Sequence, residues 1–188
     1  MIKKKIVTIV GAGVIGAGWA ARMLACGLIV NAYDPSVKAR KQLLSNTKTA
    51  LKSLQRLGLN KNAKLSNLKI YSDLKESLNS TTFVQENAPE NEKLKKKLLK
   101  DIDKLLPKNI IIASSSSGLL PTRIQSLCNY PERVCIGHPF NPVYLLPLVE
   151  LVSGKQTKKN TITRTKKFYE GIGCLLYTSD AADERCRG

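Results

Sequence analysis

The feature that most constrains the fold of this chain is a run of glycines near its start. The apolar run Ile6–Val10 is typical of a strand that is buried on both faces. The motif Gly11-Ala12-Gly13-Val14-Ile15-Gly16 follows it directly and leads into an apolar helix expected over Val14–Ala25. A strand, a glycine turn and a helix in this order predict a dinucleotide-binding unit, with the phosphates on the helix N-terminus.

Each glycine has an expected task in such a unit. Gly11 allows the tight turn, Gly13 lets the backbone approach a pyrophosphate, and Gly16 lets the helix pack closely on the strand. Asp34 lies about 20 residues further on, at the end of the next predicted strand, where a carboxylate can accept hydrogen bonds from ribose hydroxyls. An acid here repels a 2′-phosphate, and the two residues after it offer no arginine to bind one. NAD is therefore expected rather than NADP, and FAD is the other dinucleotide to weigh.

The rest of the chain alternates between short β-type runs and longer helical ones, which is the pattern of parallel βαβ units. Further strands are expected at 28–34, 68–71, 82–86, 109–113, 134–137 and 148–152. Helices are expected at 36–57, 89–106, 121–128 and 157–169, with Ser36 capping the first, Pro89 opening the second, and a short extra helix possible within 60–67. The expected fold is an α/β, Rossmann-type, doubly wound and mostly parallel sheet.

Composition restricts the class of protein. Of the 188 residues, 43% are hydrophobic and 24% are charged, as in an ordinary globular protein. No apolar stretch approaches the roughly 20 residues needed to cross a bilayer. The charged start resembles that of a signal peptide, but the apolar run behind it is broken by the glycine turn and lacks a cleavage pattern. We therefore expect a cytoplasmic protein that does not associate with membranes.

The formal net charge of +17 and the five cysteines suggest two other interpretations. The lysines of 93–100 alternate with apolar residues and have no aromatic side chains between them, which favours a solvated helix face over a nucleic-acid-binding surface. The scattered cysteines contain no Cys-x-x-Cys pair, which argues against a zinc site or a disulfide framework. We expect free thiols, no metal and no nucleic acid, and a basic nucleic-acid-binding module is the less favoured alternative.

The last residues, 174–188, differ in character from the rest. Lysine is absent from them, and the stretch from Cys174 to Glu184 resembles the translation of a transposon adapter used in sequencing libraries. We expect the native domain to occupy 1–173 and to be cut short there, with 174–188 as a foreign tail. A natural polar C-terminus is the alternative.

A histidine, a glutamate and a serine run are the candidates for chemistry. His138 is the only histidine, and it lies at the end of a predicted strand, where open α/β sheets bind their ligands. Histidine is a suitable base for a hydroxyl proton near neutral pH. Glu150 lies in an apolar predicted strand, where a carboxylate needs a partner such as an imidazole. Serines 114–117 follow another strand, so their hydroxyls are expected in the same crevice. From residue types alone, a plain core or loop role for His138 is equally compatible.

These segments together resemble the 3-hydroxyacyl-CoA dehydrogenase superfamily over about residues 5–173. The resemblance is carried by the glycine motif, by Phe83-Val84-Gln85-Glu86-Asn87-Ala88-Pro89-Glu90, by the serine run, and by His138-Pro139-Phe140-Asn141-Pro142 through Glu150. Pro139 departs from the His-Phe-Phe-Asn-Pro that is usual in the acyl-CoA enzymes, and this segment is most similar to the branch that oxidises L-carnitine. The L-gulonate branch has a similar serine-rich segment and the His-Pro start, but differs in the residues that follow.

The resemblance implies a role for each matching position. His138 matches the catalytic histidine, Glu150 the carboxylate paired with it, and Ser117 the serine that contacts the substrate hydroxyl and the nicotinamide. Glu86 and Asn141 match cofactor contacts near the nicotinamide end.

The remaining implications concern cofactor, substrate and assembly. Asp34 matches the ribose acid, and Asn91 stands where the acyl-CoA enzymes carry a lysine, which weakens an acyl-CoA assignment. The resemblance implies NAD as cofactor, a small-molecule 3-hydroxy acid as substrate, and a homodimer for the full-length protein. It also implies a second, helical domain that is missing here, so the fragment alone is expected to be inactive. A noncatalytic, crystallin-like NAD-binding protein is the alternative of another class.

Overall fold

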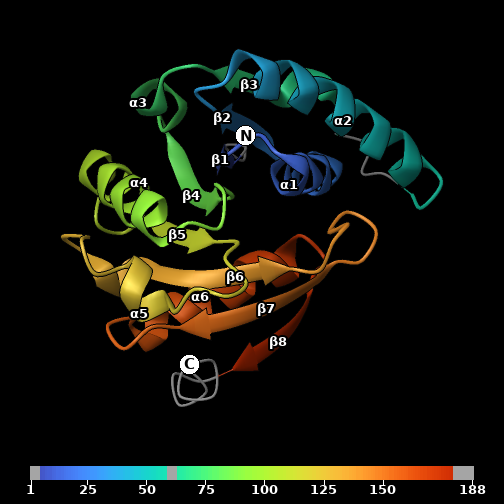
Figure 1. The fold of residues 1–188 in the computed structure, drawn as a ribbon. Coiled ribbons are helices and arrows are strands. Elements are labelled where there is room, and N and C mark those ends of the chain that lie inside the picture. Colours follow the sequence, from blue (N-terminus) through green and yellow to red (C-terminus); the bar gives the residue numbers. More distant parts are fainter. Residues whose placement is uncertain (1–4, 59–62, 180–188) are drawn as a thin grey trace.

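The computed structural model describes residues 5–58 and 63–179, which form one eight-stranded sheet with helices on both faces (Figure 1). The strands are β1 (Ile6–Val10), β2 (Ile29–Tyr33), β3 (Leu68–Tyr71), β4 (Thr81–Glu86), β5 (Ile111–Ser114), β6 (Val134–Pro139), β7 (Leu148–Ser153) and β8 (Leu175–Ser179). Their order in the sheet is β3-β2-β1-β4-β5-β6-β7-β8. Every neighbouring pair is parallel except β6 and β7, which run antiparallel. The prediction of a mostly parallel, Rossmann-type sheet is confirmed.

The chain winds outward from the middle of this sheet in both directions. From β1 it proceeds to β3 at one edge, and from β4 it proceeds to β8 at the other. The winding therefore reverses between β1 and β4, and such a switch point opens a crevice beyond the carboxyl ends of the strands. The turn after β1, the loop after β4 and the serine run after β5 all follow the carboxyl ends of parallel strands, so the topology gathers them at one end of the sheet.

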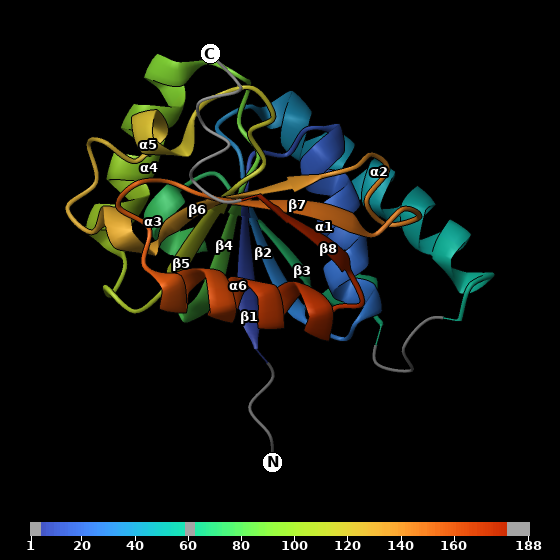
Figure 2. The same ribbon diagram turned by 90° about the horizontal axis from the view of Figure 1, so that it is seen from below.

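The helices cover both faces of the sheet. They are α1 (Val14–Ala25), α2 (Val37–Gln55), α3 (Leu74–Ser77), α4 (Glu92–Leu105), α5 (Pro121–Ile124) and α6 (Lys159–Gly171), with 3-10 turns at Leu65–Asn67 and Pro131–Arg133. In Figure 2, α4 and α5 lie on the opposite side of the sheet from α1 and α2. This is the doubly wound arrangement. No helix in the described ranges has the length and apolarity of a membrane span.

Capping side chains decide where two long helices begin. The Ser36 hydroxyl accepts a hydrogen bond from the backbone N–H of Ala39, so α2 begins as predicted. The prediction that Pro89 opens the next helix is wrong. Asn91 is the N-cap of α4, and its side-chain oxygen accepts from the Leu94 N–H at 2.9 Å. Because the cap lies two residues after the proline, the segment between β4 and α4 stays a loop.

Other boundaries differ by a few residues. α5 ends at Ile124, earlier than predicted, and α3 is a single turn capped by Asp73 that the sequence pattern does not reveal. One turn is too short to show a helical period. The possible helix within 60–67 falls partly on residues 59–62, which lie outside the described residues, and its end forms the 3-10 turn.

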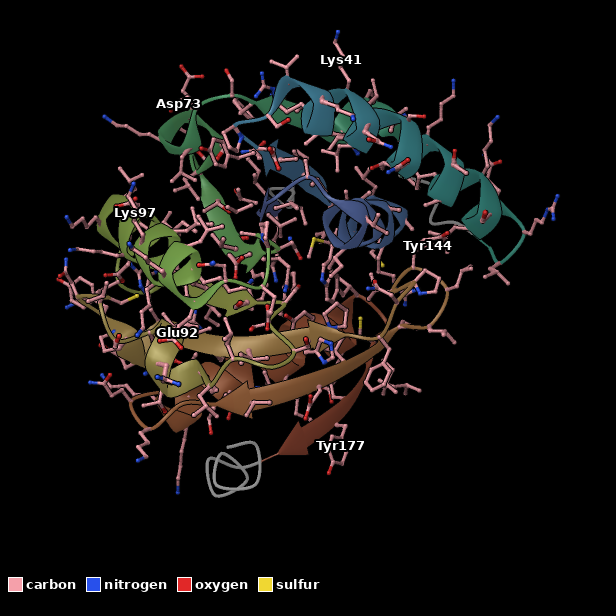
Figure 3. All side chains as sticks on the ribbon, in the orientation of Figure 1. Lys41, Asp73, Glu92, Lys97, Tyr144 and Tyr177 are labelled. Carbon is pink, nitrogen blue, oxygen red and sulfur yellow. The ribbon has the colours of Figure 1, made fainter. Side chains whose placement is uncertain are left out.

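The lysines of α4 are mostly exposed or half-buried, as predicted for a solvated face. Figure 3 shows Lys97, and Lys41 on α2, directed away from the sheet. Lys95 is the exception, because only 1% of its surface is exposed. The prediction of a solvated face is wrong at this position, since the alternation along a helix cannot reveal an acid on a neighbouring strand.

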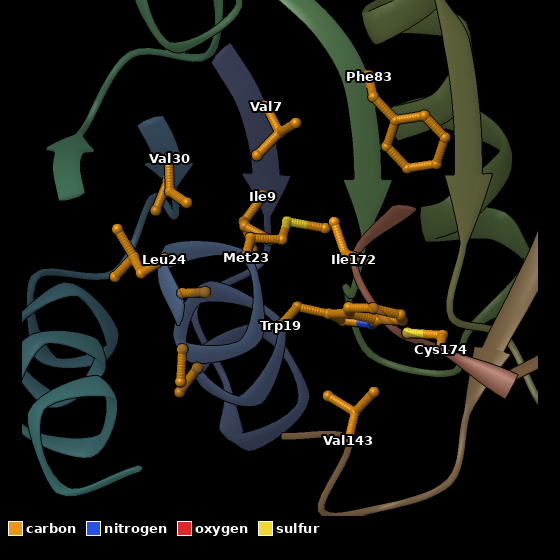
Figure 4. Close-up of a cluster of buried hydrophobic side chains, with 14 of the residues drawn as sticks. Val7, Ile9, Trp19, Met23, Leu24, Val30, Phe83, Val143, Ile172 and Cys174 are labelled. Carbon is orange, nitrogen blue, oxygen red and sulfur yellow. The ribbon is translucent and has the colours of Figure 1, made fainter. Parts of the chain in front are cut away.

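Two apolar cores lie on the two faces of the sheet. The larger packs α1, α2 and α6 onto it, and Figure 4 shows Trp19, Met23 and Leu24 of α1 in this core. The smaller packs α4 and α5 onto the other face through residues such as Leu99 and Ile124. Successive strand residues point to opposite faces, so that β1 contributes to both cores.

The edge strand β8 lies in the stretch that the sequence analysis set apart as a foreign tail. It pairs in parallel with β7. Such pairing uses backbone groups that any residue except proline carries, so the strand does not reveal where residues 175–179 come from. The origin of 174–188 stays a prediction, and residues 180–188, with Cys186, lie outside the described residues.

The four described cysteines are free thiols: Cys26, Cys128, Cys135 and Cys174. Burial raises the pKa of the Cys135 thiol to about 12. A thiol held so far from ionisation is unreactive near neutral pH, which suits a packing role.

Candidate active site

The glycine turn after β1 is tightly packed at two of its three glycines. Gly11 has a φ of +101°, and a Cβ there would lie 2.7 Å from the carbonyl carbon of Asn87. A Cβ on Gly16 would lie 2.0 Å from the carbonyl oxygen of Gly11 and 3.3 Å from the Ile9 side chain. Side chains at these positions would push β1, α1 and the loop after β4 apart.

Gly13 has a different environment. It is the N-cap of α1, it is exposed, and nothing lies within 4 Å of the Cβ that would be built on it. No side chain caps this helix, so its first N–H groups face open space at the positive end of the helix dipole. Val14 is 76% exposed and Ile15 is half-buried beside it. A turn with bare N–H groups and room for an anion fits the pyrophosphate of a dinucleotide.

Asp34 follows β2 and is hydrogen-bonded to the glycine turn. Its Oδ2 accepts a hydrogen bond from the backbone N–H of Ala12 at 2.8 Å, and its Oδ1 accepts from the N–H of Ser36 at 2.8 Å. A carboxylate can accept about four hydrogen bonds. Lone pairs therefore remain on Asp34 for the ribose hydroxyls of a dinucleotide on the turn.

An arginine also lies beside Asp34, although it is six residues further along the chain. Arg40 Nη1 donates to the backbone oxygen of Asp34 at 2.6 Å and to that of Pro35 at 3.0 Å. The first turns of α2 bring it back over the strand end. The sequence analysis considered only the two residues after Asp34 and so missed Arg40. The predicted helix after the Ser36 cap could have revealed it, because residues in the first turns of a helix lie close to the residues before its cap.

Two antiparallel strands bring His138 and Glu150 together. They are directly opposite each other in the register of β6 and β7, so their side chains share one face of the sheet. His138 Nδ1 lies 3.5 Å from Glu150 Oε2. The histidine side chain is 27% exposed and the glutamate side chain 12%. The Glu150 carboxylate therefore lies beside Nδ1 of the imidazole.

The serine run does not present all its hydroxyls to the crevice, and that prediction is wrong for three of the four. Ser114 donates to Glu86, and Ser116 donates to Glu90. Ser115 donates to the side-chain oxygen of Asn87 at 2.7 Å. These three serines are buried, and their hydroxyls bind the end of β4 and the loop after it.

Ser117, the last serine of the run, is exposed. It is the serine that the resemblance predicts to contact the substrate. The loop that it begins is held by hydrogen bonds from backbone N–H groups to Glu90. The structure therefore separates three serines that shape the loop from one whose side chain is accessible at the carboxyl end of the sheet.

Glu86, at the end of β4, is fully buried. Lys95 Nζ lies 2.8 Å from one carboxylate oxygen and 3.0 Å from the other, and it also donates to the carbonyl oxygen of Ala88 at 2.9 Å. These contacts with the protein itself satisfy the buried charge of the Glu86 carboxylate. A cofactor contact by Glu86 stays a prediction, and Lys95 is a residue that the sequence analysis missed.

The segment after His138 carries an exposed aromatic ring. The rings of Phe140 and His138 lie 5.9 Å apart between centroids, and Phe140 is 47% exposed. Asn141, predicted to contact the nicotinamide, is exposed and precedes a cis peptide bond to Pro142. Its cofactor contact stays a prediction.

Tyr144 lies in the segment between β6 and β7. It packs near Gly18 of α1 and lines a cavity of about 560 Å³, together with Arg22, Cys26 and the end of α6. Among the described residues, no group of three or more His, Cys, Asp or Glu side chains is arranged to hold a metal ion.

Comparisons with known proteins identify the family of the chain. The model of the 3-hydroxyacyl-CoA dehydrogenase NAD-binding domain matches residues 6–175. The chain belongs to this family. Its cofactor is NAD, which fits the open helix N-terminus at Gly13 and the carboxylate of Asp34.

Individual relatives are similar over most of the chain. It is 43% identical to L-carnitine dehydrogenase from Staphylococcus epidermidis over 165 residues, which cover 88% of this chain and 51% of that one. It is 45% identical to L-carnitine dehydrogenase from Burkholderia mallei, with 87% and 51% covered. The structure of (S)-3-hydroxybutyryl-CoA dehydrogenase from Ralstonia eutropha superimposes with a TM-score of 0.87 at 32% identity, with 95% and 64% covered. The chain spans about half the length of the two L-carnitine dehydrogenases.

Proposed function

We propose that this chain is the NAD-binding part of an enzyme that oxidises a 3-hydroxy acid to the 3-keto acid, with L-carnitine as its substrate. The observation that carries the proposal is the pair of His138 and Glu150, 3.5 Å apart at the end of the sheet that also holds the glycine turn. A noncatalytic NAD-binding protein would have no need of a partly exposed imidazole beside a carboxylate in an apolar strand.

The residues divide the work of such a reaction. NAD, when bound, supplies the acceptor for the hydride that leaves C3 of the substrate. His138 takes the hydroxyl proton at the ring nitrogen that Glu150 does not hold. Glu150 steadies the imidazolium that results, and Ser117 orients the substrate hydroxyl. Each of these roles rests on the resemblance as well as on the geometry.

L-carnitine is favoured within the class by the relatives and by one substitution. The two L-carnitine dehydrogenases share 43% and 45% of their aligned residues with this chain, against 32% for the 3-hydroxybutyryl-CoA dehydrogenase. Asn91 stands where the acyl-CoA enzymes carry a lysine, and here it caps α4. The exposed ring of Phe140 offers a face to a trimethylammonium group, although the acyl-CoA pattern has a phenylalanine there too.

The test is a side-by-side assay of the full-length gene product for NAD reduction with L-carnitine, 3-hydroxybutyryl-CoA and L-gulonate. The expected result is turnover with L-carnitine at a kcat/KM well above the other two. A higher kcat/KM with either of the other two substrates would change the proposed substrate but not the proposed class of reaction. No turnover with any of them, in a folded protein that binds NADH, would overturn the proposed function. For the full-length protein we also propose a cytoplasmic homodimer, which light scattering and cell fractionation can test.

A further inference from the structure

One carboxylate gathers the backbone of the loop that carries Ser117. Glu90 Oε1 accepts hydrogen bonds from the N–H groups of Ser117 at 3.0 Å, Gly118 at 2.9 Å and Leu119 at 3.3 Å. The Ser116 hydroxyl donates to the same oxygen. Three consecutive N–H groups that converge on one point form an anion-binding nest of the kind that elsewhere holds phosphate. In this chain the anion is supplied by the protein itself.

The other oxygen of this carboxylate is tied to the buried charges beneath the site. Glu90 Oε2 lies 3.7 Å from Lys95 Nζ. Lys95 in turn binds both oxygens of Glu86, and Glu86 accepts from the Ser114 hydroxyl. The loop after β4 and the loop after β5 are therefore joined by charge-assisted hydrogen bonds at several points.

The late start of α4 makes this arrangement possible. Glu90 precedes the N-cap Asn91, so its backbone belongs to the loop after β4. Its side chain is 40% exposed, whereas that of Lys95 is 1% exposed. Glu90 is thus anchored on the buried side by Lys95 and reaches toward the surface, where Ser117 is exposed.

We propose that Glu90 is a positioning residue for the reaction. Its carboxylate fills the nest of Ser117, Gly118 and Leu119, fixes that backbone, and so holds the Ser117 hydroxyl where the substrate hydroxyl binds. It also closes the nest to other anions, so that substrate carboxylates and cofactor phosphates do not bind there. This inference rests on the proposed function for the role of Ser117, and on the contacts above for the role of Glu90.

The test compares two substitutions with a matched control. Glu90→Ala removes the acceptor, and Glu90→Gln keeps one oxygen but loses the charge. Glu170→Gln removes a charge from an exposed glutamate on α6, far along the chain from the loop. The first readout is amide hydrogen exchange at 117–119 in this chain, which does not depend on activity. The second is steady-state kinetics of the full-length gene product, with acetate added as a small carboxylate.

In the Ala variant, exchange at the three amides should rise about ten-fold or more, as expected when hydrogen bonds to a charged group are lost. The kcat should fall by about the same factor, while the KM for NAD changes less than about two-fold. The Gln variant should recover part of the kcat, acetate should restore part of it in the Ala variant, and Glu170→Gln should match the wild type.

Two results would overturn the proposal. One is wild-type exchange at 117–119 in Glu90→Ala, and the other is a loosened loop with unchanged kcat. Failure of the proposed function is seen separately, because the wild-type protein would then show no turnover. The exchange data would in that case still decide whether Glu90 fixes the loop.

Discussion

The backbone N–H of Ala12 donates a 2.8 Å hydrogen bond to Asp34 Oδ2. This bond joins the glycine turn after β1 to the acid after β2, the two features from which the sequence predicts the cofactor. We therefore propose two tasks for Asp34, which are to hold the turn on which the phosphates would lie and to bind the ribose. A change at Asp34 should alter both the affinity for the dinucleotide and the choice between NAD and NADP.

Asp34→Asn should weaken NADH binding about ten-fold, since it replaces a charged acceptor by a neutral amide. The affinity for NADPH relative to NADH should rise, because the repulsion of a 2′-phosphate is removed and Arg40 lies close by. Titration of each cofactor, followed by energy transfer from Trp19, measures both effects. Asp73→Asn is the control, as it removes an exposed charge at the cap of α3. Unchanged NADH affinity in Asp34→Asn would contradict the assigned role.

His138→Gln should remove most turnover of the full-length protein and leave its NADH affinity within about two-fold of the wild type. Glutamine cannot take the hydroxyl proton, and general-base catalysis typically contributes 10²–10⁴-fold. Glu150→Gln should cost less, because the imidazole remains. The measurements are kcat for both variants and cofactor titration of the 188-residue chain. Turnover of His138→Gln at the wild-type rate would remove the histidine from the mechanism.

The glycines of the turn should respond differently to alanine. Gly16→Ala places a Cβ 2.0 Å from the backbone oxygen of Gly11, so it should cost more than about 3 kcal/mol of unfolding free energy. Gly13→Ala meets nothing within 4 Å and should leave the stability almost unchanged. Its methyl group would enter the space that we propose for the pyrophosphate, so NADH binding should weaken. Urea unfolding and NADH titration of both variants separate the two effects, and equal stability losses would refute the distinction.

The sequence predicts the sheet and the cofactor end of the site because those features depend on local patterns. β1, α1 and the Ser36 cap follow from apolar runs, glycines and a capping residue, all within short windows. The predicted partnership of His138 and Glu150 has its counterpart in their opposite places in the register, because two consecutive antiparallel strands close the distance between them.

Contacts between distant segments are what the sequence does not reveal. In the sequence, Lys95 is one of several lysines on a helix face that is predicted to be solvated. Only the fold shows that Glu86 of β4 lies beside it. Three of the serines serve the loop after β4, and nothing in a run of identical residues distinguishes them from Ser117. The role of Glu90 depends on the residue at which α4 begins. Helix boundaries are hard to predict because neighbouring residues compete to be the N-cap.

A buried ion pair outside the site should contribute strongly to stability. The Arg133 guanidinium binds Asp103 Oδ1 through Nε at 3.0 Å and Nη2 at 2.7 Å, and it donates to carbonyl oxygens at the end of α4. Arg133→Met should lower the free energy of unfolding by about 3–5 kcal/mol, because it leaves a buried carboxylate without its cation. Lys166→Met, from the exposed pair with Glu170 at 3.9 Å, should change it by less than about 1 kcal/mol. Similar midpoints of urea unfolding for the two variants would contradict this.

Acid should destabilise the chain partly through Glu90. Burial raises the pKa of its carboxyl, but the hydrogen bonds from Ser116 and Gly118, together with Lys95, more than offset this and lower the pKa below its usual value. A pKa that is lower in the folded state gives stability that is present above the unfolded pKa of about 4.3 and is lost as the pH falls through the folded pKa. The advantage of the wild type over Glu90→Gln in urea midpoint should therefore be full at pH 7 and shrink below about pH 4. Glu170→Gln is the control for loss of one negative charge. A wild-type advantage that stays constant down to pH 2 would show that the Glu90 carboxylate does not titrate with the loop.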